Sequence, residues 1–499
     1  MAVAAPTTSS SNSGSINKLQ DSFLTDVDLT TALDNPPEFR VESDLLGEQN
    51  VPADALYGIQ TQRAHQNFHI TGVPISHFPE LVVALAMVKL SAAKANQRHG
   101  LLSDDKAKVI IEACEELISG EHHEAFIVDL IQGGAGTSTN MNANEVIANI
   151  GLAKMGLEFG QYQFLHPNND VNQSQSTNDV YPSAARLAVI FAAQPLKDAI
   201  NQLQDSLAKK ADEFAEVLKM GRTQMQDAVP MTLGQEFKAF ASDLGGEVAQ
   251  INHSCHQLCE VNLGGTAIGT GINAPNGYAE TVVNELTQIS GLPIHLAKDL
   301  IAASSDMGAF VKFSGTLRRL AIKLSKLSND LRLLSSGPRT GLGEINLPAV
   351  QPGSSIMPGK VNPVIPEAVN QTAFQVMGTD MSITMAAEAG QLQLNAMEPL
   401  IIYNLLNNAR MLQKAIHILD NLCIQGITAN KEHCSQHVKN SIGIVTALVP
   451  HIGYENATRI AEQALMSGVS VPDLVRQEGL LTEDELEEIL SLGNIIHNL

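Results

Sequence analysis

The sequence predicts a mainly helical protein built around a bundle of long helices. The strongest sign is a run of Phe and Leu residues over residues 310–334, spaced alternately three and four positions apart. Similar spacings recur at residues 196–218 and 240–258. The apolar residues are chiefly Leu, Ala, Ile and Val, whereas aromatic residues make up only 4% and Trp is absent. Helices this long bury their apolar faces against one another, so we expect a multi-helix bundle in an oligomer.

The length of 499 residues allows about three domains. Residues 1–36 are rich in Ser, Thr, Ala, Asn and Pro without any periodicity, which predicts a disordered extension. We expect a mainly helical N-terminal domain at 37–176, the long-helix bundle at 177–430, and a small helical domain at 431–499.

Local patterns place individual elements within these domains. The apolar spacing predicts helices at residues 80–98 and 104–119, followed by a polar cluster at 132–146. In the C-terminal domain, Thr482 with Glu485 three residues later is typical of a capping box that begins a helix.

Charge and cysteine usage restrict the partners and the compartment. The net charge of −22 and the lack of basic runs argue against nucleic acid or an anionic membrane surface as a partner. No apolar run approaches the roughly 20 residues of a membrane span. The five cysteines are widely spread and form no disulfide framework, so we expect a cytoplasmic protein.

No metal site is expected from the Cys and His residues. Cys255 belongs to the apolar series at 240–258, so it is predicted to be a core residue although His253 and His256 lie beside it. His433, Cys434 and His437 provide too few ligands for zinc. The pair His122 and His123 is interpreted as a solvated helix end.

The segment most suggestive of catalysis is the loop GSSIMPGKVNP at residues 353–363. It holds two hydroxyls, Ser354 and Ser355, shortly before Lys360, among Gly and Pro residues that direct the backbone. The lysine has no acidic neighbour and is free to hold an anion. The loop is not a nucleotide-binding P-loop, because the spacing of its glycines is wrong and Val361 replaces the metal-binding Ser or Thr.

Three more polar segments interrupt the helical pattern, at residues 137–142, 176–178 and 221–236. Their hydroxyl and amide side chains are suited to donating hydrogen bonds to carboxylate oxygens. They indicate chemistry in which the substrate's own carboxylate stabilises a carbanion. The Gly-rich stretch 264–271 mimics a dinucleotide fingerprint, but we expect it to follow a helix rather than a strand, open no βαβ unit and form a tight connection between helices.

The chain resembles the aspartase/fumarase superfamily, and within it more closely the aspartate ammonia-lyases. GSSIMPGKVNP is the superfamily signature, and its companion motifs occur in the expected order: GGAGTSTNMNANEV, SQSTND, GRTQMQDAVPMTLGQE and EAGQLQLNAMEP. The resemblance covers roughly residues 39–494. It implies a three-domain aspartase/fumarase-like fold whose long helices form the core of a homotetramer.

The resemblance also implies an activity, the reversible anti elimination of ammonia from L-aspartate to give fumarate through an enediolate intermediate. Each active site of the family is assembled from three subunits, so we expect the polar clusters to lie far apart within one chain. No cofactor is implied, and activation by Mg²⁺ is not indicated by any residue. The alternatives are a class II fumarate hydratase acting on L-malate and a catalytically silent structural homologue, the second disfavoured by intact Ser354, Lys360 and Asn362.

The same resemblance assigns roles to individual residues. Ser354 is the base that removes a proton from Cβ, and its alkoxide must be stabilised by loop N–H groups and a nearby positive charge. Lys360 and Thr137 are the other expected catalytic residues. The binding residues are Lys360, Asn362 and Thr223 for the α-carboxylate, Thr137, Ser176, Thr177 and Ser355 for the β-carboxylate, Asn178 with Thr137 and Thr177 for the amino group, and Asn140 within the same cluster.

Gln224 bears on the choice between ammonia and water as the leaving group. Fumarases usually have a His at this position, paired with a Glu that corresponds to Glu367. Gln cannot titrate, which favours loss of ammonia. Glu367 is therefore a candidate catalytic residue or a helix cap. His166 matches a secondary anion site of fumarases, or it is a loop residue hydrogen-bonded to its neighbours.

Overall fold

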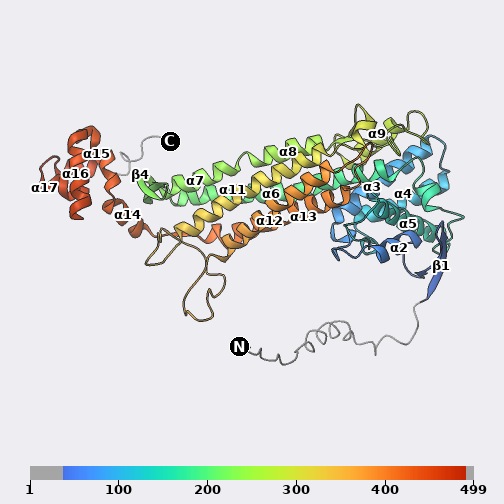
Figure 1. The fold of residues 1–499 in the computed structure, drawn as a ribbon, viewed down its shortest axis with the longest axis horizontal. Helices are drawn as coiled ribbons and strands as arrows, with labels where there is room; N and C mark the ends of the chain where they lie inside the picture. Colours follow the sequence, from blue (N-terminus) through green and yellow to red (C-terminus); the bar gives the residue numbers. More distant parts are fainter. Residues whose placement is uncertain (1–37, 491–499) are drawn as a thin grey trace, which may run out of the picture.

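The computed structural model describes residues 38–490, so the predicted extension at 1–36 and the last residues of the predicted C-terminal domain lie outside it. The described chain is elongated and mainly helical (Figure 1). N-terminal elements gather at one end, long helices run through the middle, and small C-terminal helices form the other end. The predicted fold class, a mainly α protein with a central long-helix bundle, is confirmed.

The N-terminal end combines one β-hairpin with four helices. Its elements are β1 (Phe39–Asp44), β2 (Gly47–Pro52), α2 (Ile59–Asn67), α3 (Pro79–Arg98), α4 (Asp104–Ser119) and α5 (Thr137–Lys154). Helices α3 and α4 confirm the two helices predicted here. The polar cluster at 132–146 contains the start of α5, which is buried along nearly its whole length.

The bundle contains the four longest helices within residues 38–490, which are α6 (Thr177–Glu213), α11 (Gly308–Leu334), α12 (Val364–Glu388) and α13 (Glu398–Leu422). The shorter helices α7 (Leu233–Leu244) and α8 (Glu247–Gln257) also belong to it. Every Phe and Leu of the seven-residue repeat in α11 is buried, as the spacing predicts. The core of the bundle is continuous with that of α3, α4 and α5.

Two of the predicted long helices end earlier than their apolar spacing suggested. Helix α6 stops at Glu213, and Leu218 begins strand β3 (Leu218–Thr223), which pairs antiparallel with β4 (Gln226–Thr232). The series at 240–258 is divided between α7 and α8 by Gly245 and Gly246, because each glycine weakens a helix by about 1 kcal/mol.

The prediction for the Gly-rich stretch was wrong about its neighbours. It follows a two-residue strand, β5 (Glu260–Val261), and leads through α9 (Tyr278–Ser290) to a parallel partner, β6 (His295–Leu296). This is a minimal strand–helix–strand unit. Strands of two residues leave no alternation in the sequence to detect. A single turn, α10 (Leu300–Ala303), then precedes α11.

The C-terminal end has a second hydrophobic core of its own, to which Met220 of β3 is added. Its helices are α14 (Lys431–Asn440), α15 (Val445–Ile452), α16 (Tyr454–Ser467), α17 (Val471–Gln477) and α18 (Glu483–Ile489). The predicted capping box is confirmed, because Glu485 N–H donates to Thr482 Oγ1 at 3.3 Å and Thr482 N–H to Glu485 Oε2 at 2.8 Å. The domain boundaries themselves stay predictions.

Short elements complete the described chain. A two-residue antiparallel pair, β7 (Ile345–Asn346) with β8 (Thr428–Ala429), joins the ends of the bundle to α14. Single turns of 3₁₀ or π helix are η1 (Ile75–His77), η2 (His123–Ala125), η3 (Pro167–Val171), η4 (Ile424–Gly426) and η5 (Ile442–Ile444). Within residues 38–490, no helix combines the length and apolarity required to cross a bilayer.

Candidate active site

The signature loop lies between α11 and α12 and projects from the bundle (Figure 1). Ser354 Oγ accepts hydrogen bonds from the backbone N–H groups of Ile356 at 3.2 Å and Met357 at 3.0 Å. Two donors on one hydroxyl oxygen favour negative charge there. The loop therefore directs two N–H donors to the hydroxyl oxygen of the residue that the sequence predicts to be the base.

The same loop is closed on itself by two further hydrogen bonds. Gly353 N–H donates to the Lys360 carbonyl at 2.8 Å, and the Asn362 side chain donates to the Gly353 carbonyl at 2.7 Å. A Cβ on Gly353 would lie 2.6 Å from the Lys360 carbonyl oxygen, so only glycine fits this crossing. The ring fixes the backbone on both sides of Ser354.

The charged and hydroxyl side chains of the loop face outward. Ser355 and Lys360 are exposed, and within residues 38–490 Lys360 forms no ion pair. Glu367 lies half-buried in the first turn of α12, whose N-cap is Pro363 and which no side chain caps. The alternative prediction, that Glu367 is a helix cap, is therefore wrong.

A second group of predicted residues meets at the first turns of α5 and α6. Asn140 on α5 donates its side-chain N–H to Thr177 Oγ1 on α6 at 3.1 Å. Ser176 is the N-cap of α6, with its hydroxyl oxygen accepting the Asn178 N–H at 3.3 Å. Two helix N-termini thus lie side by side, an arrangement that favours bound carboxylate.

The Gly-rich stretch at residues 264–271 forms hydrogen bonds with the first turn of α6. Asn178 donates its side-chain N–H to the Ala267 carbonyl at 2.7 Å. Buried Asp179 accepts the N–H groups of Gly264 at 2.9 Å and Thr266 at 3.0 Å. This loop is therefore a structural support for the candidate site, consistent with its interpretation as a tight connection.

Thr137 begins α5 next to a glycine whose backbone is left-handed. Its hydroxyl donates to the Gly134 carbonyl at 2.7 Å, which leaves the hydroxyl oxygen as an acceptor. Gly136, the N-cap, has φ +89°, and a Cβ there would lie 2.4 Å from the Tyr181 ring. The close packing of α5 against α6 thus depends on a residue without a side chain.

The sequence analysis missed Lys89, which lies beneath this cluster. Lys89 is fully buried on α3 and donates to Asn172 Oδ1 and Gln175 Oε1, both at 2.9 Å. Burial lowers the pKa of Lys89 to about 7. The available signal was a lysine within residues 81–90 of α3, which are otherwise apolar.

The third group lies at the tip of the β3–β4 hairpin. Thr223 and Gln224 are exposed there, and Gln224 and Met225 have φ values of +52° and +64°. Two non-glycine residues with positive φ in a two-residue turn store backbone strain. Strain of this kind clusters at functional sites, so the tip is a candidate contact to ligand.

These three groups do not meet within one chain. Helix α6 has 37 residues and so spans roughly 55 Å. Thr177 stands at its first residue, whereas Thr223 lies in the hairpin just beyond its last. The signature loop extends from the bundle at the hairpin's end of α11 (Figure 1). The sequence-based expectation that the clusters lie far apart agrees with this geometry.

His166 occupies a local structural role. Its Nδ1 accepts the backbone N–H groups of Asn168 at 3.0 Å and Asn169 at 3.2 Å, which caps the π turn η3. Burial lowers its pKa, so the acceptor form is favoured. The ring also lines a cavity of about 710 Å³ beside Arg63. The interpretation as a hydrogen-bonded loop histidine is borne out by these contacts.

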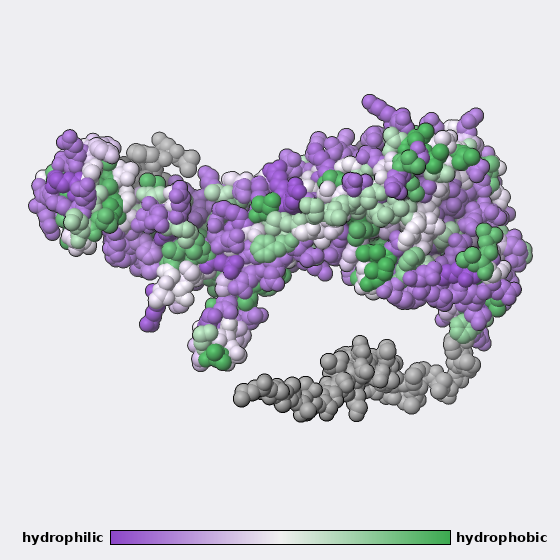
Figure 2. All heavy atoms as spheres, viewed as in Figure 1, coloured by the Kyte–Doolittle hydropathy of each residue, from purple (hydrophilic) through white to green (hydrophobic). Residues whose placement is uncertain are grey.

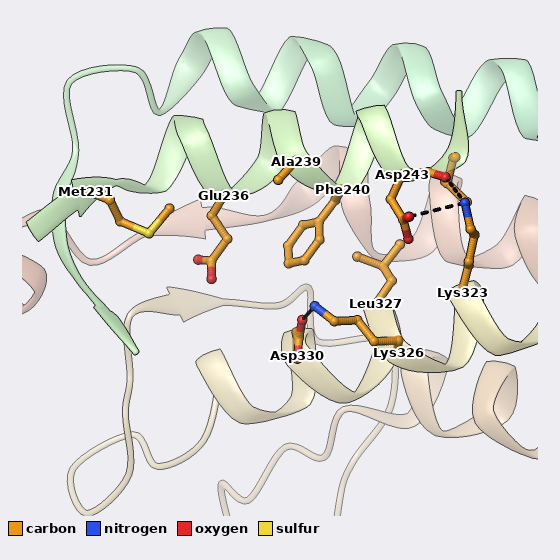
Figure 3. Close-up of a pocket in the computed structure, with 10 residues that line it drawn as sticks. Met231, Glu236, Ala239, Phe240, Asp243, Lys323, Lys326, Leu327 and Asp330 are labelled. Atoms are coloured by element: carbon orange, nitrogen blue, oxygen red, sulfur yellow. Dashed lines mark hydrogen bonds and ion pairs between the residues drawn. The ribbon is translucent and has the colours of Figure 1, made fainter. Parts of the chain in front are cut away.

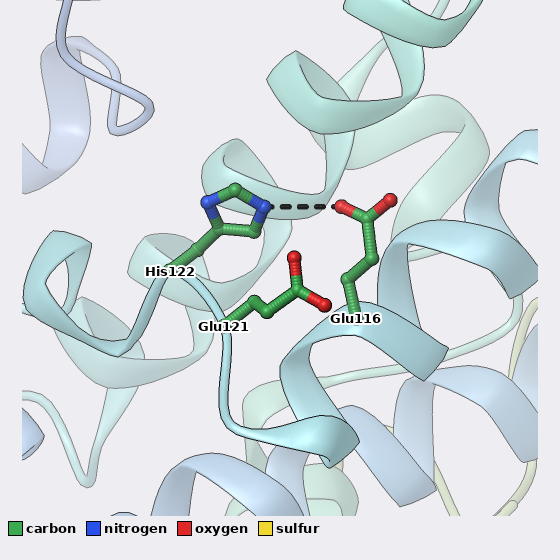
Figure 4. A group of neighbouring side chains, drawn as sticks. All are labelled: Glu116, Glu121 and His122. Atoms are coloured by element: carbon green, nitrogen blue, oxygen red, sulfur yellow. Dashed lines mark hydrogen bonds and ion pairs between the residues drawn. The ribbon is translucent and has the colours of Figure 1, made fainter.

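Other clusters of ionisable residues are already paired. Glu116, Glu121 and His122 lie close together (Figure 4), but Glu116 is bound by Lys154 and by His122 at 3.0 Å. The hydrogen bond from Lys154 is the main cause of the lowered pKa of Glu116. Glu116 is therefore already bound. His122 and His123 follow the end of α4 as predicted but are half-buried, so their interpretation as a solvated helix end was wrong about exposure.

A groove of about 460 Å³ lies between α7 and α11 (Figure 3). Its two lysines are each paired with an acid, Lys323 with Asp243 at 3.2 Å and Lys326 with Asp330. An anionic substrate would have to displace these partners. The groove also contains none of the predicted site residues.

The buried cysteines match their predicted role. All five are free, and Cys255 on α8 lies in the hydrophobic core. Burial raises the pKa of Cys255 to about 11, so it is an inert thiol at neutral pH.

Comparison with known proteins identifies the class to which this fold and loop belong. Residues 47–378 match the lyase family, and residues 444–497 match the fumarase C C-terminus. Fumarate lyase:delta crystallin from Brucella melitensis has 55% identity and a TM-score of 0.89, covering 91% of this chain and 98% of that one. The chain therefore belongs to the lyase family, within the aspartase/fumarase superfamily.

Sequence relatives distinguish the branches of that family. Aspartate ammonia-lyase from Pseudomonas fluorescens is 61% identical over 469 residues, or 94% of this chain and 98% of that protein. The enzyme of the same name from Escherichia coli K12 is 54% identical, covering 92% of this chain and 96% of that protein. Class II fumarase from Schistosoma mansoni has 36% identity and a TM-score of 0.86, covering 92% of this chain and 100% of that one.

Proposed function

We propose that this chain catalyses the reversible anti elimination of ammonia from L-aspartate to give fumarate. It is a carbon–nitrogen lyase by its membership of the lyase family and its 54–62% identity to aspartate ammonia-lyases. The fumarate hydratase alternative has support only at lower identity, 36% to a class II fumarase. Gln224, which cannot titrate, is consistent with an amine as the leaving group.

The observation that carries the proposal is the environment of Ser354. Its Oγ accepts two backbone N–H groups, and the same loop bears Lys360. We propose that the Ser354 alkoxide removes a proton from Cβ of L-aspartate, forming the Ser354 hydroxyl and an enediolate on the β-carboxylate. The enediolate then expels the amino group as ammonia and leaves the double bond of fumarate. Lys360 stabilises negative charge at the loop.

The remaining predicted residues bind the three polar groups of the substrate. Ser176, Thr177 and Ser355 donate to the β-carboxylate, where charge accumulates, and each well-aimed donor contributes about 3–4 kcal/mol to the transition state. Lys360, Asn362 and Thr223 hold the α-carboxylate. The oxygens of Thr137 and Asn178 accept hydrogen bonds from the amino group, a role that suits Thr137 because its own proton is directed to Gly134.

We infer that the working enzyme is a homotetramer in which three subunits contribute to each site. Support comes from the separation of the three clusters within one chain, because no single subunit presents them together. Helix α12 also leaves Phe374, Met381 and Met385 exposed by 58%, 63% and 65% on one face. Figure 2 shows apolar atoms along the viewed face of the bundle, the kind of surface that a neighbouring subunit covers.

The proposed chemistry uses only groups of this polypeptide, so no cofactor enters any step. Acid–base work falls to Ser354, and charge stabilisation falls to amides, hydroxyls and Lys360. We place the protein in the cytoplasm, which suits five free cysteines, since a reducing compartment keeps thiols unpaired.

The proposal is tested by following fumarate absorbance after mixing the full chain with L-aspartate or with L-malate. We expect turnover of L-aspartate alone. Turnover of L-malate but not of L-aspartate would identify a hydratase instead.

Ser354→Ala should abolish turnover of L-aspartate, because the Cβ proton loses its acceptor, while subunit assembly and melting temperature stay unchanged. Ser336→Ala, a hydroxyl deletion on the segment between α11 and the loop, is the matched control and should keep activity. Retained activity in Ser354→Ala would remove Ser354 from its role.

A further inference from the structure

We propose that Lys89 is a positioning residue that acts through Asn172 and Asn140 to direct the hydroxyl proton of Thr177 toward the substrate. The inference rests on the proposed function, since it deepens the role given there to Thr177. It assigns a task to a buried lysine that the elimination mechanism itself does not use.

The contacts form an unbroken chain from α3 to α6. Lys89 Nζ donates to Asn172 Oδ1 at 2.9 Å, and the Asn140 side-chain N–H donates to the same oxygen at 3.2 Å. Asn140 also donates to Thr177 Oγ1 at 3.1 Å. Gln175 Oε1 is the second acceptor of the lysine, at 2.9 Å. All the side chains that form these hydrogen bonds are buried or half-buried.

The direction of these hydrogen bonds follows from the chemistry of an amine. A charged lysine has only donors, and a neutral one keeps two N–H donors, so in either form both facing amides can present oxygen to it. Asn172 then offers an acceptor to Asn140, whose NH₂ group is fixed between Asn172 and Thr177. Within residues 38–490, the Thr177 hydroxyl makes this one side-chain hydrogen bond, as the acceptor. Its own proton is therefore available to the β-carboxylate.

An alternative orientation would cost the enzyme this donor. If the Asn140 amide were reversed, its oxygen would face Thr177 and accept the hydroxyl proton. Thr177 would then present only lone pairs to an anionic substrate. Lys89 disfavours that arrangement, because Asn172 would have to turn its own NH₂ group toward the lysine, placing donor against donor.

The groups that face Lys89 do not compete with this arrangement. The ionisable neighbours are Asp179 on α6 and Cys114 on α4. Asp179 is held by the backbone N–H groups of Ser176, Gly264 and Thr266, and burial raises the pKa of Cys114, so that thiol stays neutral. The hydrogen bonds from Lys89 to Asn172 and Gln175 tolerate loss of the lysine's charge, because a neutral amine keeps two N–H donors for two amide oxygens.

A double-mutant cycle tests the inference, with Lys89→Met and Thr177→Val as the two single variants. Lys89→Met matches the length of lysine but removes its donors. We expect it to lower kcat/KM for L-aspartate by roughly 10–100-fold, as loss of outer-sphere orienting partners does elsewhere. In the Thr177→Val background the same change should have little further effect, because the hydroxyl it orients is gone. If the loss of kcat/KM in the double variant equals the product of the two single losses, the two residues act independently and the proposal is wrong.

The controls separate positioning from folding and from the proposed function. Lys210→Met removes another buried lysine, which binds the Ile427 carbonyl at 2.9 Å far along α6, and should leave kcat/KM unchanged. If Lys89→Met does not fold, Asn172→Leu keeps the lysine but cuts its link to Asn140 and must give the same non-additive loss. If the wild-type chain does not turn over L-aspartate, the proposed function is wrong. If the wild type is active but the two substitutions act independently in the double variant, only this inference is wrong.

Discussion

Lys89 shows at the scale of a single residue how a side chain outside the reaction can determine both function and stability. Its burial without an ion-pair partner is costly for the charged form, and the two amide oxygens and the nearby charge of Asp179 offset only part of that cost. In the proposal above, these hydrogen bonds serve the reaction by orienting Asn140 and Thr177.

The same burial predicts how stability depends on pH. The pKa of Lys89 falls from 10.5 to about 7 on folding, because burial disfavours the charged amine. Between these pH values the unfolded chain holds one proton more than the folded chain, so stability rises with pH across this window. Below pH 7 the folded chain carries the buried charge, and stability no longer changes with pH on account of this group.

Melting temperatures of wild type and Lys89→Met at pH 6 and pH 9 measure this effect. We expect the wild type to gain stability relative to the variant on going from pH 6 to pH 9. Lys210→Met is the matched comparison, since its lysine is paired with Glu213. A difference between wild type and Lys89→Met that is independent of pH would mean that the amine keeps an ordinary pKa.

At the scale of elements, the start of α5 depends on Gly136. The residue has φ +89°, and a Cβ would lie within 2.4–2.6 Å of three Tyr181 ring atoms. Gly136→Ala therefore adds overpacking, about 1–3 kcal/mol, to the strain of a left-handed backbone. Because Thr137 follows directly, the variant should also lose activity. Urea unfolding and kcat/KM measure the two effects.

Gly156→Ala separates the effect of backbone strain from the effect of overpacking. Gly156 lies just beyond the other end of α5 with φ +75°, and a Cβ added there would meet no atom within 4 Å. The substitution should cost only the backbone strain, about 1 kcal/mol, and leave activity intact. Equal losses in the two variants would show that contact with Tyr181 is unimportant.

The elements differ in how far the sequence could predict them. Helix α11 was predictable because its buried Phe and Leu residues hold one period for 25 positions, interrupted by no Pro and by a single glycine, Gly315. The same apolar spacing misled beyond Glu213, since Leu218 faces a core from a strand rather than a helix. The strands β5 and β6 left no periodic signal in two residues each.

The candidate site was predictable to a similar degree. Ser354, Lys360 and Asn362 stood out because hydroxyl, amine and amide groups are unexpected in a simple turn. Lys89 could not be placed in the same way, because its role arises from tertiary contacts with Asn172 and Gln175, more than 80 residues away. A lysine in the middle of an apolar stretch, here residues 81–90, is nevertheless a signal worth following.

At the scale of the whole molecule, the distance between the clusters supports the proposal that activity belongs to the assembly. Helix α6 holds the groups at its two ends roughly 55 Å apart, so one chain cannot close the site around a substrate with only four carbon atoms. A site shared by subunits predicts that two inactive variants restore each other when their subunits mix.

Ser354→Ala and Thr177→Val provide that test, because their residues lie on different clusters. Each homotetramer should be nearly inactive, since every site lacks one group. After joint unfolding and refolding, a site that draws its loop from one variant and its α6 from the other is intact. If equal amounts of the two subunits mix randomly, about a quarter of the sites contain both intact groups. Activity should therefore recover to about a quarter of the wild-type value. Co-refolding Ser354→Ala with Lys360→Ala, two residues of one loop, is the control and should recover nothing. No recovery in the first mixture would place the loop and the start of α6 of one subunit in the same site. Recovery in the control would mean that Ser354 and Lys360 of one loop do not serve the same site.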